Sequence, residues 1–462
     1  MIDTMQSYFQ PPDARGFPKN RHIGNARFSR VCCTIRVLSY LFISLLNCLP
    51  PTPALATDAA QESMEPSPDR VLAQCRQVAN WQLREFGGQA EGNWVNAVAL
   101  IGFVELYHIW HDFEYEAAIV ELGRRNHWDF VQPPHQHRIL KLLGLSPKPQ
   151  APADPNGYRI DLNAGQPFFA DDHAHGQYAV ELYWHLRDPV MVNPILQRIQ
   201  YVLAHPPTTP LSQDKKENRA RWNWSDALFM DPPLYARLGA LTGDPRFFDF
   251  LDREFAASTE YLWSNEYDLI FRDDRFSQGR KSGPNGLPIF WGRGNAWLYA
   301  GITRVLEVYP RDRPARAMYL NYFRKLTRSL TPLRLGNGLW GPDLLDSSRY
   351  KYPDTSASAL ILYALAWGIN HGILKNERDR QTLISGWKAL QSFVSDQGEL
   401  SGVQPSDYQP RCFDQLNSEA FGSGAYLLAC SQIVQVLKGK AVDKRALSAG
   451  ARLHSMATTG KR

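Results

Sequence analysis

The sequence predicts an all-α protein, an (α/α)6 barrel of six helical hairpins, and three observations lead to this prediction. One pattern recurs six times: a small residue, an apolar helical stretch, a polar turn often with Asp or Pro, and a second amphipathic helix. Sustained strand alternation is hard to find. The copies are irregularly spaced, beginning near Ile101, His175, Pro232, Ala300, Ser358 and Ser423. Such spacing fits a closed ring of six inner and six outer helices better than an open solenoid, whose repeats are usually shorter and more uniform.

Helical periodicity and turn residues support the individual hairpins. Residues 298–309 carry apolar side chains at i, i+3, i+4 and i+7, as expected for an amphipathic helix. Residues 242–245 (Thr-Gly-Asp-Pro) and 309–312 (Tyr-Pro-Arg-Asp) supply turn signals between helices. In such a barrel the loops at one end line a concave funnel, so the segments that lead into the inner helices are the candidates for function.

The segment before the barrel is typical of an export signal. Basic residues up to Arg36 precede the apolar run 37–46, which prolines and Ala54-Leu55-Ala56 follow. The run is too short for a membrane span, so cleavage after Ala56 is expected to give an exported protein, periplasmic or secreted, with no membrane attachment. Cys48 leaves a lipoprotein as an alternative, although Asn47 is a poor residue before a lipidated cysteine.

These signals divide the chain into four predicted parts. They are an N-terminal extension with signal peptide (1–56), a linker (57–69), the barrel (70–438) and a flexible C-terminal tail (439–462). Cleavage would leave Cys75, Cys412 and Cys430, of which two could form one disulfide, while buried free thiols are an equal alternative.

Composition excludes several classes of protein. With 44% hydrophobic residues the chain can bury a large core, which excludes a disordered chain. The net charge is +5, and residues 1–56, with six Lys or Arg and two Asp, contribute +4 of it, so the remainder carries about +1. Nucleic-acid binding is therefore not expected. The aromatic content of 12% favours carbohydrate binding, because aromatic faces stack on sugar rings, although most aromatic side chains fill cores.

The densest candidate site is the segment 221–233, in which Asp226 stands where a helix should begin. Trp222 and Trp224 precede Asp226, and an apolar run follows it. Apolar surroundings raise the pKa of a carboxyl group toward that of a general acid. The alternative is that Asp226 serves only as a helix N-cap.

A second cluster, Asp171, Asp172, His173 and His175, lies at the equivalent position one repeat earlier. Its carboxylates could face Asp226 across the funnel as an acid/base pair on a glycosidic substrate. A metal site and a simple cap or surface turn are the alternatives.

The third cluster, residues 290–297, contains Trp291, Arg293 and Trp297. Glycines on both sides of Arg293 allow close approach to a ligand, its guanidinium can bind a carboxylate, and the indoles offer flat faces. This combination suits an acidic sugar, while a tight turn with core tryptophans is the alternative. Arg272, in a charged loop whose default interpretation is a solvated turn, and Trp340, before the fifth hairpin, are expected at the same mouth.

Together these motifs resemble those of glycoside hydrolase families 88 and 105, the unsaturated glucuronyl and rhamnogalacturonyl hydrolases, with the stronger likeness to family 105. The matching order is Trp-x-Trp-Ser-Asp-Ala-Leu-Phe-Met-x-Pro-Pro, Leu-Thr-Gly-Asp, Ile-Phe-Arg-Asp, Phe-Trp-Gly-Arg-Gly-Asn-Ala-Trp and Pro-Asp-Thr-Ser-Ala-Ser. The resemblance implies an (α/α)6 barrel that acts on an oligosaccharide with a non-reducing-end 4,5-unsaturated uronic acid, left by a polysaccharide lyase. An Asp protonates C4, water adds at C5, and the hemiketal opens and releases the aglycone, without a metal or organic cofactor.

Carried over by position, the acid/base Asp of these families falls on Asp226 and the second active-site Asp on Asp171, with Asp172 as its rival. Arg293 and Trp297 would hold the uronate carboxylate and ring. The chain departs from the usual motifs at Gly292, Ala296, Ala357 and Asp231, the last of which is expected to add a charge near the acid.

Other classes stay open. A conventional inverting glycosidase on the same barrel would also use two Asp, and a non-catalytic sugar-binding protein would use only the aromatic faces. A lyase or epimerase would need His or Tyr bases, for which His173 and His175 are the local candidates. The aglycone sugar and the oligomeric state are not set by these patterns.

Overall fold

The computed structural model describes residues 66–87, 93–110, 113–125, 128, 167–277, 279–406, 410–439 and 441–451. The predicted signal peptide and Cys48 lie outside the described residues.

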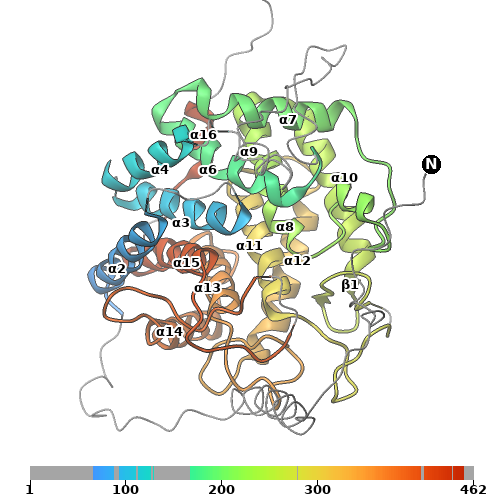
Figure 1. Cartoon of the computed structure of the whole chain (residues 1–462), viewed down its shortest axis with the longest axis vertical. Helices are drawn as coiled ribbons and strands as arrows, with labels where there is room; N and C mark the ends of the chain where they lie inside the picture. The colour runs from blue at the N-terminus through green and yellow to red at the C-terminus, as the bar shows by residue number, and fades with distance from the viewer. Residues whose placement is uncertain are drawn as a thin grey trace, which may run out of the picture. The chain divides into compact units, whose positions relative to one another are not determined.

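Inner and outer helices alternate along the described chain (Figure 1). The inner helices are buried on nearly all sides: α3 (Trp94–Trp110), α6 (Ala170–Leu186), α9 (Pro232–Thr242), α11 (Gly292–Val308), α13 (Thr355–Asn370) and α15 (Ala420–Lys438). The outer helices expose one face: α2 (Pro68–Phe86), α4 (Phe113–Arg125), α7 (Asn193–Ala204), α10 (Pro245–Leu262), α12 (Arg316–Leu330) and α14 (Glu377–Gln391). The six predicted hairpins are thus confirmed.

Short elements fill the connections. They are the four-residue helix α8 (Ala227–Met230), the 3-10 turns η1 (Pro189–Met191), η2 (Lys216–Ala220) and η3 (Thr331–Leu333), and the strands β1 (Trp263–Ser264) and β2 (Leu269–Ile270). The strands form one antiparallel hairpin in which Trp263 pairs with Ile270.

The turn between α9 and α10 shows how the sequence ends and starts helices. Gly243 ends α9 in the left-handed region, with φ of 72°. The Asp244 side chain then accepts a hydrogen bond from Arg246 N at 2.9 Å, and Pro245 occupies the first turn of α10, where no N–H is needed.

The ring closes because its last inner helix packs on its first. Helix α3 contacts both α6 and α15, and α15 in turn contacts α13. Gly102 and Gly424 permit this approach: a Cβ atom at Gly424 would lie 2.2 Å from Val98 O, and one at Gly102 would lie 2.6 Å from Gly424 O. Among the described helices, α15 is long and apolar enough to cross a membrane, but 89% of its apolar window is buried in the barrel.

A disulfide joins Cys75 of α2 to Cys430 of α15. It links the first and last described hairpins across 355 residues of sequence. Of the two alternatives for these cysteines, the structure contains the bridge.

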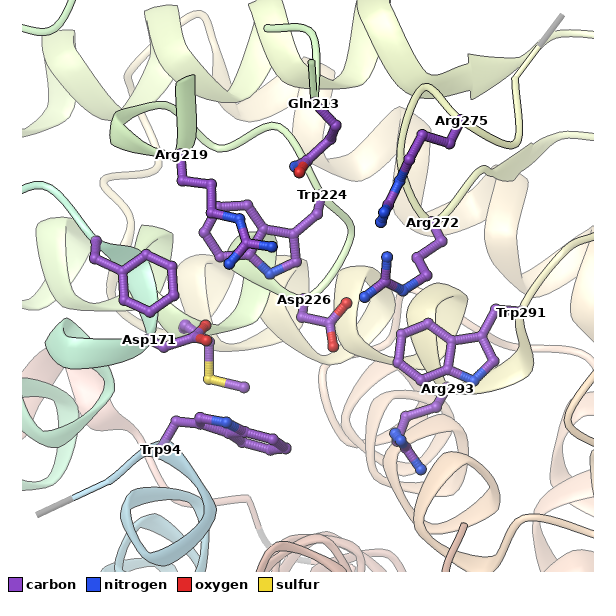
Figure 2. Close-up of a pocket in the computed structure, with 12 residues that line it drawn as sticks. Trp94, Asp171, Gln213, Arg219, Trp224, Asp226, Arg272, Arg275, Trp291 and Arg293 are labelled. Carbon is purple, nitrogen blue, oxygen red and sulfur yellow. The ribbon is translucent and has the colours of Figure 1, made fainter. Parts of the chain in front are cut away.

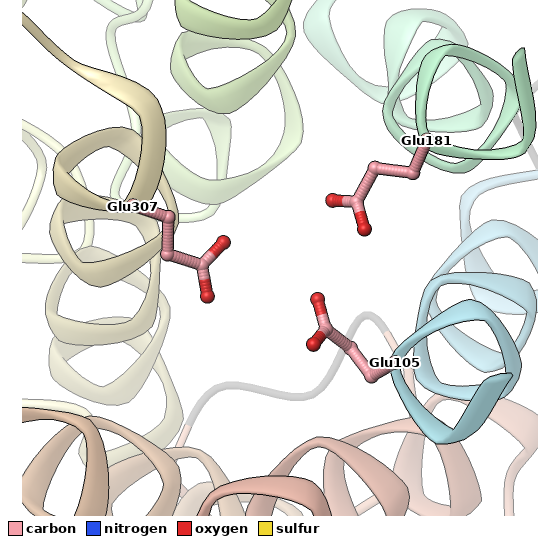
Figure 3. A group of neighbouring side chains, drawn as sticks. All are labelled: Glu105, Glu181 and Glu307. Carbon is pink, nitrogen blue, oxygen red and sulfur yellow. The ribbon is translucent and has the colours of Figure 1, made fainter. Parts of the chain in front are cut away.

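The predicted flexible tail contains a helix that the sequence analysis missed. Helix α16 (Lys444–Gly450) packs against α6, α9 and α11, and the Lys444 side chain is only 4% exposed. Its ammonium group lies among Glu105, Glu181 and Glu307, whose carboxylates face one another at the far ends of the inner helices (Figure 3). Burial of the Lys444 charge is stable only through these long-range partners, which no local sequence pattern identifies.

Candidate active site

A pocket opens where the inner helices begin. Trp94 is the first residue of α3, Asp171 the second of α6, and Arg293 the second of α11, while Asp226 directly precedes α8. The pocket is lined by Trp94, Phe169, Asp171, Gln213, Arg219, Trp224, Asp226, Met230, Arg272, Arg275, Trp291 and Arg293 (Figure 2). Six of the ten residues predicted for the site are therefore in one place: Asp171, Asp226, Trp224, Arg272, Trp291 and Arg293.

Asp226 lines the pocket and does not act as a helix cap. Its side chain makes no capping hydrogen bond to α8, and its Oδ2 accepts one from Ser225 Oγ at 3.1 Å. Burial raises the pKa of the Asp226 carboxyl above its usual range, and the charges of Arg272 and Arg293 only partly oppose this effect. The carboxyl group therefore holds its proton to a higher pH than an exposed Asp does.

Asp171 provides a second carboxylate in the same pocket. Figure 2 shows Asp171 and Asp226 both directed into the space between Trp94 and the arginines. The neighbouring Asp172 is not among the lining residues. The structure thus favours Asp171 over its rival for a role in the pocket.

The two histidines of this cluster, His173 and His175, lie buried in the core. His173 uses both ring nitrogens, contacting Asp231 Oδ1 at 2.8 Å and Pro167 O at 2.9 Å. Burial lowers the pKa of His175 to about 3, partly opposed by a backbone contact with Asn93, so this ring is neutral. Neither histidine lines the pocket, which argues against the metal and lyase alternatives for this cluster.

Asp231 does not add a free charge beside the acid. Its Oδ1 contacts His173 and its Oδ2 accepts the indole N–H of Trp222 at 2.7 Å. Both carboxylate oxygens are therefore engaged in the buried packing behind the pocket.

Arg293 forms the wall opposite Asp171. Its Nη1 donates to Gln404 O at 2.5 Å and contacts Asp354 Oδ2 at 3.2 Å, and its Nη2 donates to Pro405 O at 2.9 Å. The guanidinium also lies 4.7 Å from the centre of the Trp291 ring, a cation–π distance. These contacts fix its position before any ligand arrives.

A second arginine cluster comes from the loop after β2. The buried Asp273 carboxylate pairs with Arg272 and also with Arg275, whose Nη2 lies at 2.7 Å. Burial alone would raise the pKa of Asp273, but the two guanidinium groups hold it below its usual range. Within the described structure, Arg272 Nε and Arg293 Nε are buried without a hydrogen-bond partner.

Three tryptophans predicted to bind sugar are core residues instead. Trp222 packs edge-on against Tyr235 and Phe250, and Trp297 lies between Phe229 and Phe421. Trp340 is fully buried and donates its indole N–H to Leu330 O at 2.7 Å. None of the three lines the pocket, because each points to the helix layer behind it.

The sequence analysis missed six lining residues. Trp94 could have been found, because it starts an inner helix as Asp171 does. Phe169 adjoins the Asp171 cluster and Met230 lies in the segment 221–233, but neither was predicted to line the site. Gln213, Arg219 and Arg275 lie in connections whose course depends on the fold, so no local pattern identifies them.

Comparison with known proteins decides the family. The family model described as Glycosyl Hydrolase Family 88 matches residues 56–437. The chain belongs to glycosyl hydrolase family 88. A similar relative of this family 88 protein is an unsaturated 3S-rhamnoglycuronyl hydrolase of Alteromonas sp. (strain LOR). The two are 28% identical over 380 residues, which cover 77% of this chain and 84% of the relative.

Solved structures show the same fold. A family 88 glycosyl hydrolase from Bacteroides vulgatus aligns with a TM-score of 0.68 at 22% identity, covering 80% of this chain and all of that one. The unsaturated glucuronyl hydrolase of Bacillus sp. GL1 aligns with a TM-score of 0.55 at 15% identity, covering 79% and 96%. Family membership makes the chain a glycoside hydrolase, and the suspected relation to families 88 and 105 is confirmed.

Proposed function

We propose that this family 88 hydrolase removes a terminal 4,5-unsaturated uronic acid from lyase-generated oligosaccharides, with Asp226 as the general acid. The protonated carboxyl group of Asp226 gives its proton to C4 of the enol ether, and water adds at C5. The Asp226 carboxylate then takes a proton from that water, which restores the acid. The hemiketal opens to a ketone at C5, which leaves a hemiacetal at C1. The C1–O bond to the aglycone then breaks, which gives an aldehyde at C1 and releases the aglycone as an alcohol.

The observation that carries the proposal is the setting of Asp226. A general acid must be protonated at the working pH, and burial favours that state for Asp226. Asp171 also lines the pocket, and we assign to it the acceptance of hydrogen bonds from sugar hydroxyls or from the attacking water. Trp94, Trp224 and Trp291 supply flat apolar faces for the ring.

Positive charge in the pocket fits an acidic substrate. Arg272 and Arg293 line the pocket and their charges act on Asp226, so we assign the uronate carboxylate to them. Their charges also stabilise the Asp226 carboxylate that forms when the proton leaves.

Arg219 and Arg275 extend this positive charge to the rim. Arg219 is exposed, the Arg275 side chain is 51% exposed, and both line the pocket. The Alteromonas relative is named for a 3S-rhamnoglycuronyl substrate. From the charge of Arg219 and Arg275 we infer that the aglycone at this rim is itself anionic, for example a sulfated sugar.

Removal of Arg219 tests the assignment of the aglycone. Arg219→Met should lower kcat/KM about tenfold for a sulfated unsaturated disaccharide, because one charged contact of roughly 1.4 kcal/mol is lost, and much less for its desulfated form. Arg280→Met is the control, since Arg280 is exposed, pairs with Asp274 and does not line the pocket. Equal losses on both substrates would contradict the assignment.

A conventional inverting glycosidase is the competing function. It would hydrolyse the glycosidic bond directly and leave the C4=C5 double bond with its ultraviolet absorbance. Incubation with a panel of lyase-generated disaccharides separates the two: the proposed reaction removes the absorbance as the sugars separate, and direct hydrolysis keeps it.

Export of the protein is also a proposal. It is supported by the predicted signal peptide and by the Cys75–Cys430 disulfide, since such bonds persist mainly in oxidising compartments. N-terminal sequencing of the protein recovered outside the cytoplasm should begin at Thr57. Recovery of a reduced cytoplasmic form that keeps residues 1–56 would contradict it.

A further inference from the structure

The helix that follows the proposed acid cannot complete its own hydrogen bonds. Helix α8 has four residues and is followed by Pro232 and Pro233, which have no N–H. In a continuous helix the carbonyl of Phe229 would accept from residue 233, which here is proline. In a continuous helix Leu234 N would donate to the carbonyl of Met230. Here Leu234 N donates to Asp231 O instead, at 2.9 Å. The last carbonyls of α8 therefore need donors from another element.

Gln177 of α6 supplies both donors. Its Nε2 donates to Phe229 O at 2.8 Å and to Met230 O at 3.0 Å. Arg304 Nε donates to Gln177 Oε1 at 2.8 Å. Because arginine can only donate and carbonyls can only accept, the amide of Gln177 has one orientation that satisfies all three contacts.

The same two residues hold the backbone of the acid. Phe229 N donates to Asp226 O at 2.9 Å and Met230 N does so at 3.2 Å. Phe229 and Met230 thus each bond Asp226 through their N–H and Gln177 through their carbonyl. A displacement of α8 away from Gln177 would move Asp226 with it.

The opposite side of α8 is fixed by contact with α11. A Cβ atom at Gly301 would lie 2.0 Å from Leu228 O, so the backbones touch there. Arg304, one turn further along α11, is held by Glu105 at 2.8 Å and Glu181 at 2.7 Å. Gln177 therefore connects a rigid buried ion network to α8.

We infer that Gln177 is a positioning residue for Asp226, which it holds in place through the carbonyls of Phe229 and Met230. The inference rests on the proposed function only for the role of Asp226 as the acid. Hydrogen bonds buried this deeply have no water to replace them, so their loss leaves α8 free to shift. A shift of about 1 Å in a catalytic group can cost as much as a hundredfold in rate.

Two variants of Gln177 and one control test the inference. Gln177→Met removes both donors at similar length. Gln177→Glu keeps a partner for Arg304 but turns a carboxylate toward the two carbonyls. Gln435→Met is the control, since Gln435 is a buried glutamine of α15 that bonds Ser431 O and Val442 N away from α8.

Two readouts should change together. For both Gln177 variants kcat on an unsaturated disaccharide should fall about ten- to a hundredfold with little change in KM, and amide exchange of residues 227–231 should accelerate selectively. In Gln177→Met, which adds no charge, the alkaline limb of the kcat profile should also move to lower pH, because a loosened Asp226 gains water and its pKa falls. The charged groups around Asp226 in the pocket, Asp171, Arg219, Arg272, Arg275 and Arg293, are unchanged in these variants.

Three results would overturn the inference. They are kcat and exchange equal to those of Gln435→Met, faster exchange of α8 with unchanged kcat, and faster exchange throughout the barrel. If the wild-type enzyme destroys the double bond of no disaccharide, the proposed function fails, and the exchange of residues 227–231 still decides whether Gln177 holds α8.

Discussion

Asp226 is the residue on which two opposing physical effects meet. Burial favours its neutral form, while Arg272 and Arg293 favour its charged form. Because the burial effect is the larger, the carboxyl group can donate a proton, and the arginines then stabilise the charge left behind. This balance is what a general acid needs.

Removal of the acidic proton should stop the reaction without emptying the pocket. Asp226→Asn keeps the size of the side chain and cannot protonate C4, so kcat should fall by roughly a hundred- to ten-thousandfold. Calorimetry should still show binding of the unsaturated disaccharide. Loss of binding with retained turnover would contradict the assigned role.

The pH dependence should follow the charge of Arg272. Activity needs protonated Asp226, so it declines as pH rises through the raised pKa of that group. Arg272→Met removes a charge that lowers this pKa, so the alkaline limb of kcat should move to higher pH. Arg280→Met, outside the pocket, should leave the limb in place, and an unmoved limb in Arg272→Met would show that another group controls it.

Sequence alone distinguished the reactive residues better than the aromatic ones. Asp171 and Arg293 stood at the starts of inner helices and Asp226 before the short helix α8 that leads into α9, and position along a repeat predicts the funnel. Trp297 was chosen by the same rule, but it projects into the helix layer behind the pocket, where it meets Phe229. The direction of a side chain around a helix start depends on packing partners that a local motif does not contain.

At the scale of elements, the disulfide between α2 and α15 should stabilise the closed ring. It links residues 355 positions apart, and bridges over long loops restrict the unfolded chain most. Cys75→Ser should lower the free energy of unfolding by about 2–5 kcal/mol, measured by urea denaturation under oxidising conditions. Reductant should destabilise the wild type by at least this amount, and a free energy of unfolding of Cys75→Ser equal to that of the oxidised wild type would contradict the prediction.

Helix α16 marks the limit of element prediction. Its seven residues carry no strong amphipathic pattern, and the N-cap Asp443, which accepts from Arg445 N at 3.1 Å, is a weak signal alone. The structure gives the helix its place through Lys444. A short charged helix of this kind is recognisable only when its distant partners are known.

One buried ion network at the far end of the barrel joins the inner helices α3, α6, α9 and α11 to α16. Three carboxylates, Glu105, Glu181 and Glu307, meet three cations, Arg237, Arg304 and Lys444. Burial alone would raise the pKa of Glu181, but these cations hold it well below its usual range. The charges balance only while α16 is docked.

Loss of Lys444 should therefore destabilise the fold. Lys444→Met leaves one buried negative charge without compensation and should cost about 3–5 kcal/mol in unfolding free energy. Lys438→Met, which removes an exposed lysine at the end of α15, should cost much less. Equal unfolding midpoints for the two variants would show that α16 contributes little to the barrel.

The barrel architecture was predictable because the helical hairpin that repeats along the chain can be recognised in the sequence. Six copies of an apolar inner helix dictate a ring, and Gly102 and Gly424 let it close. The site's rim was less predictable, since Arg219 and Gln213 reach the pocket from a long connection between α7 and α8. Such connections take their course from the finished barrel rather than from local sequence.

The most direct test of the account follows the ultraviolet absorbance of a lyase-generated unsaturated disaccharide during incubation with the purified enzyme. The wild type should remove the absorbance in step with release of the aglycone, and Asp226→Asn should leave it unchanged. Aglycone release with the absorbance intact, or equal loss of absorbance with Asp226→Asn, would contradict protonation of the double bond by Asp226.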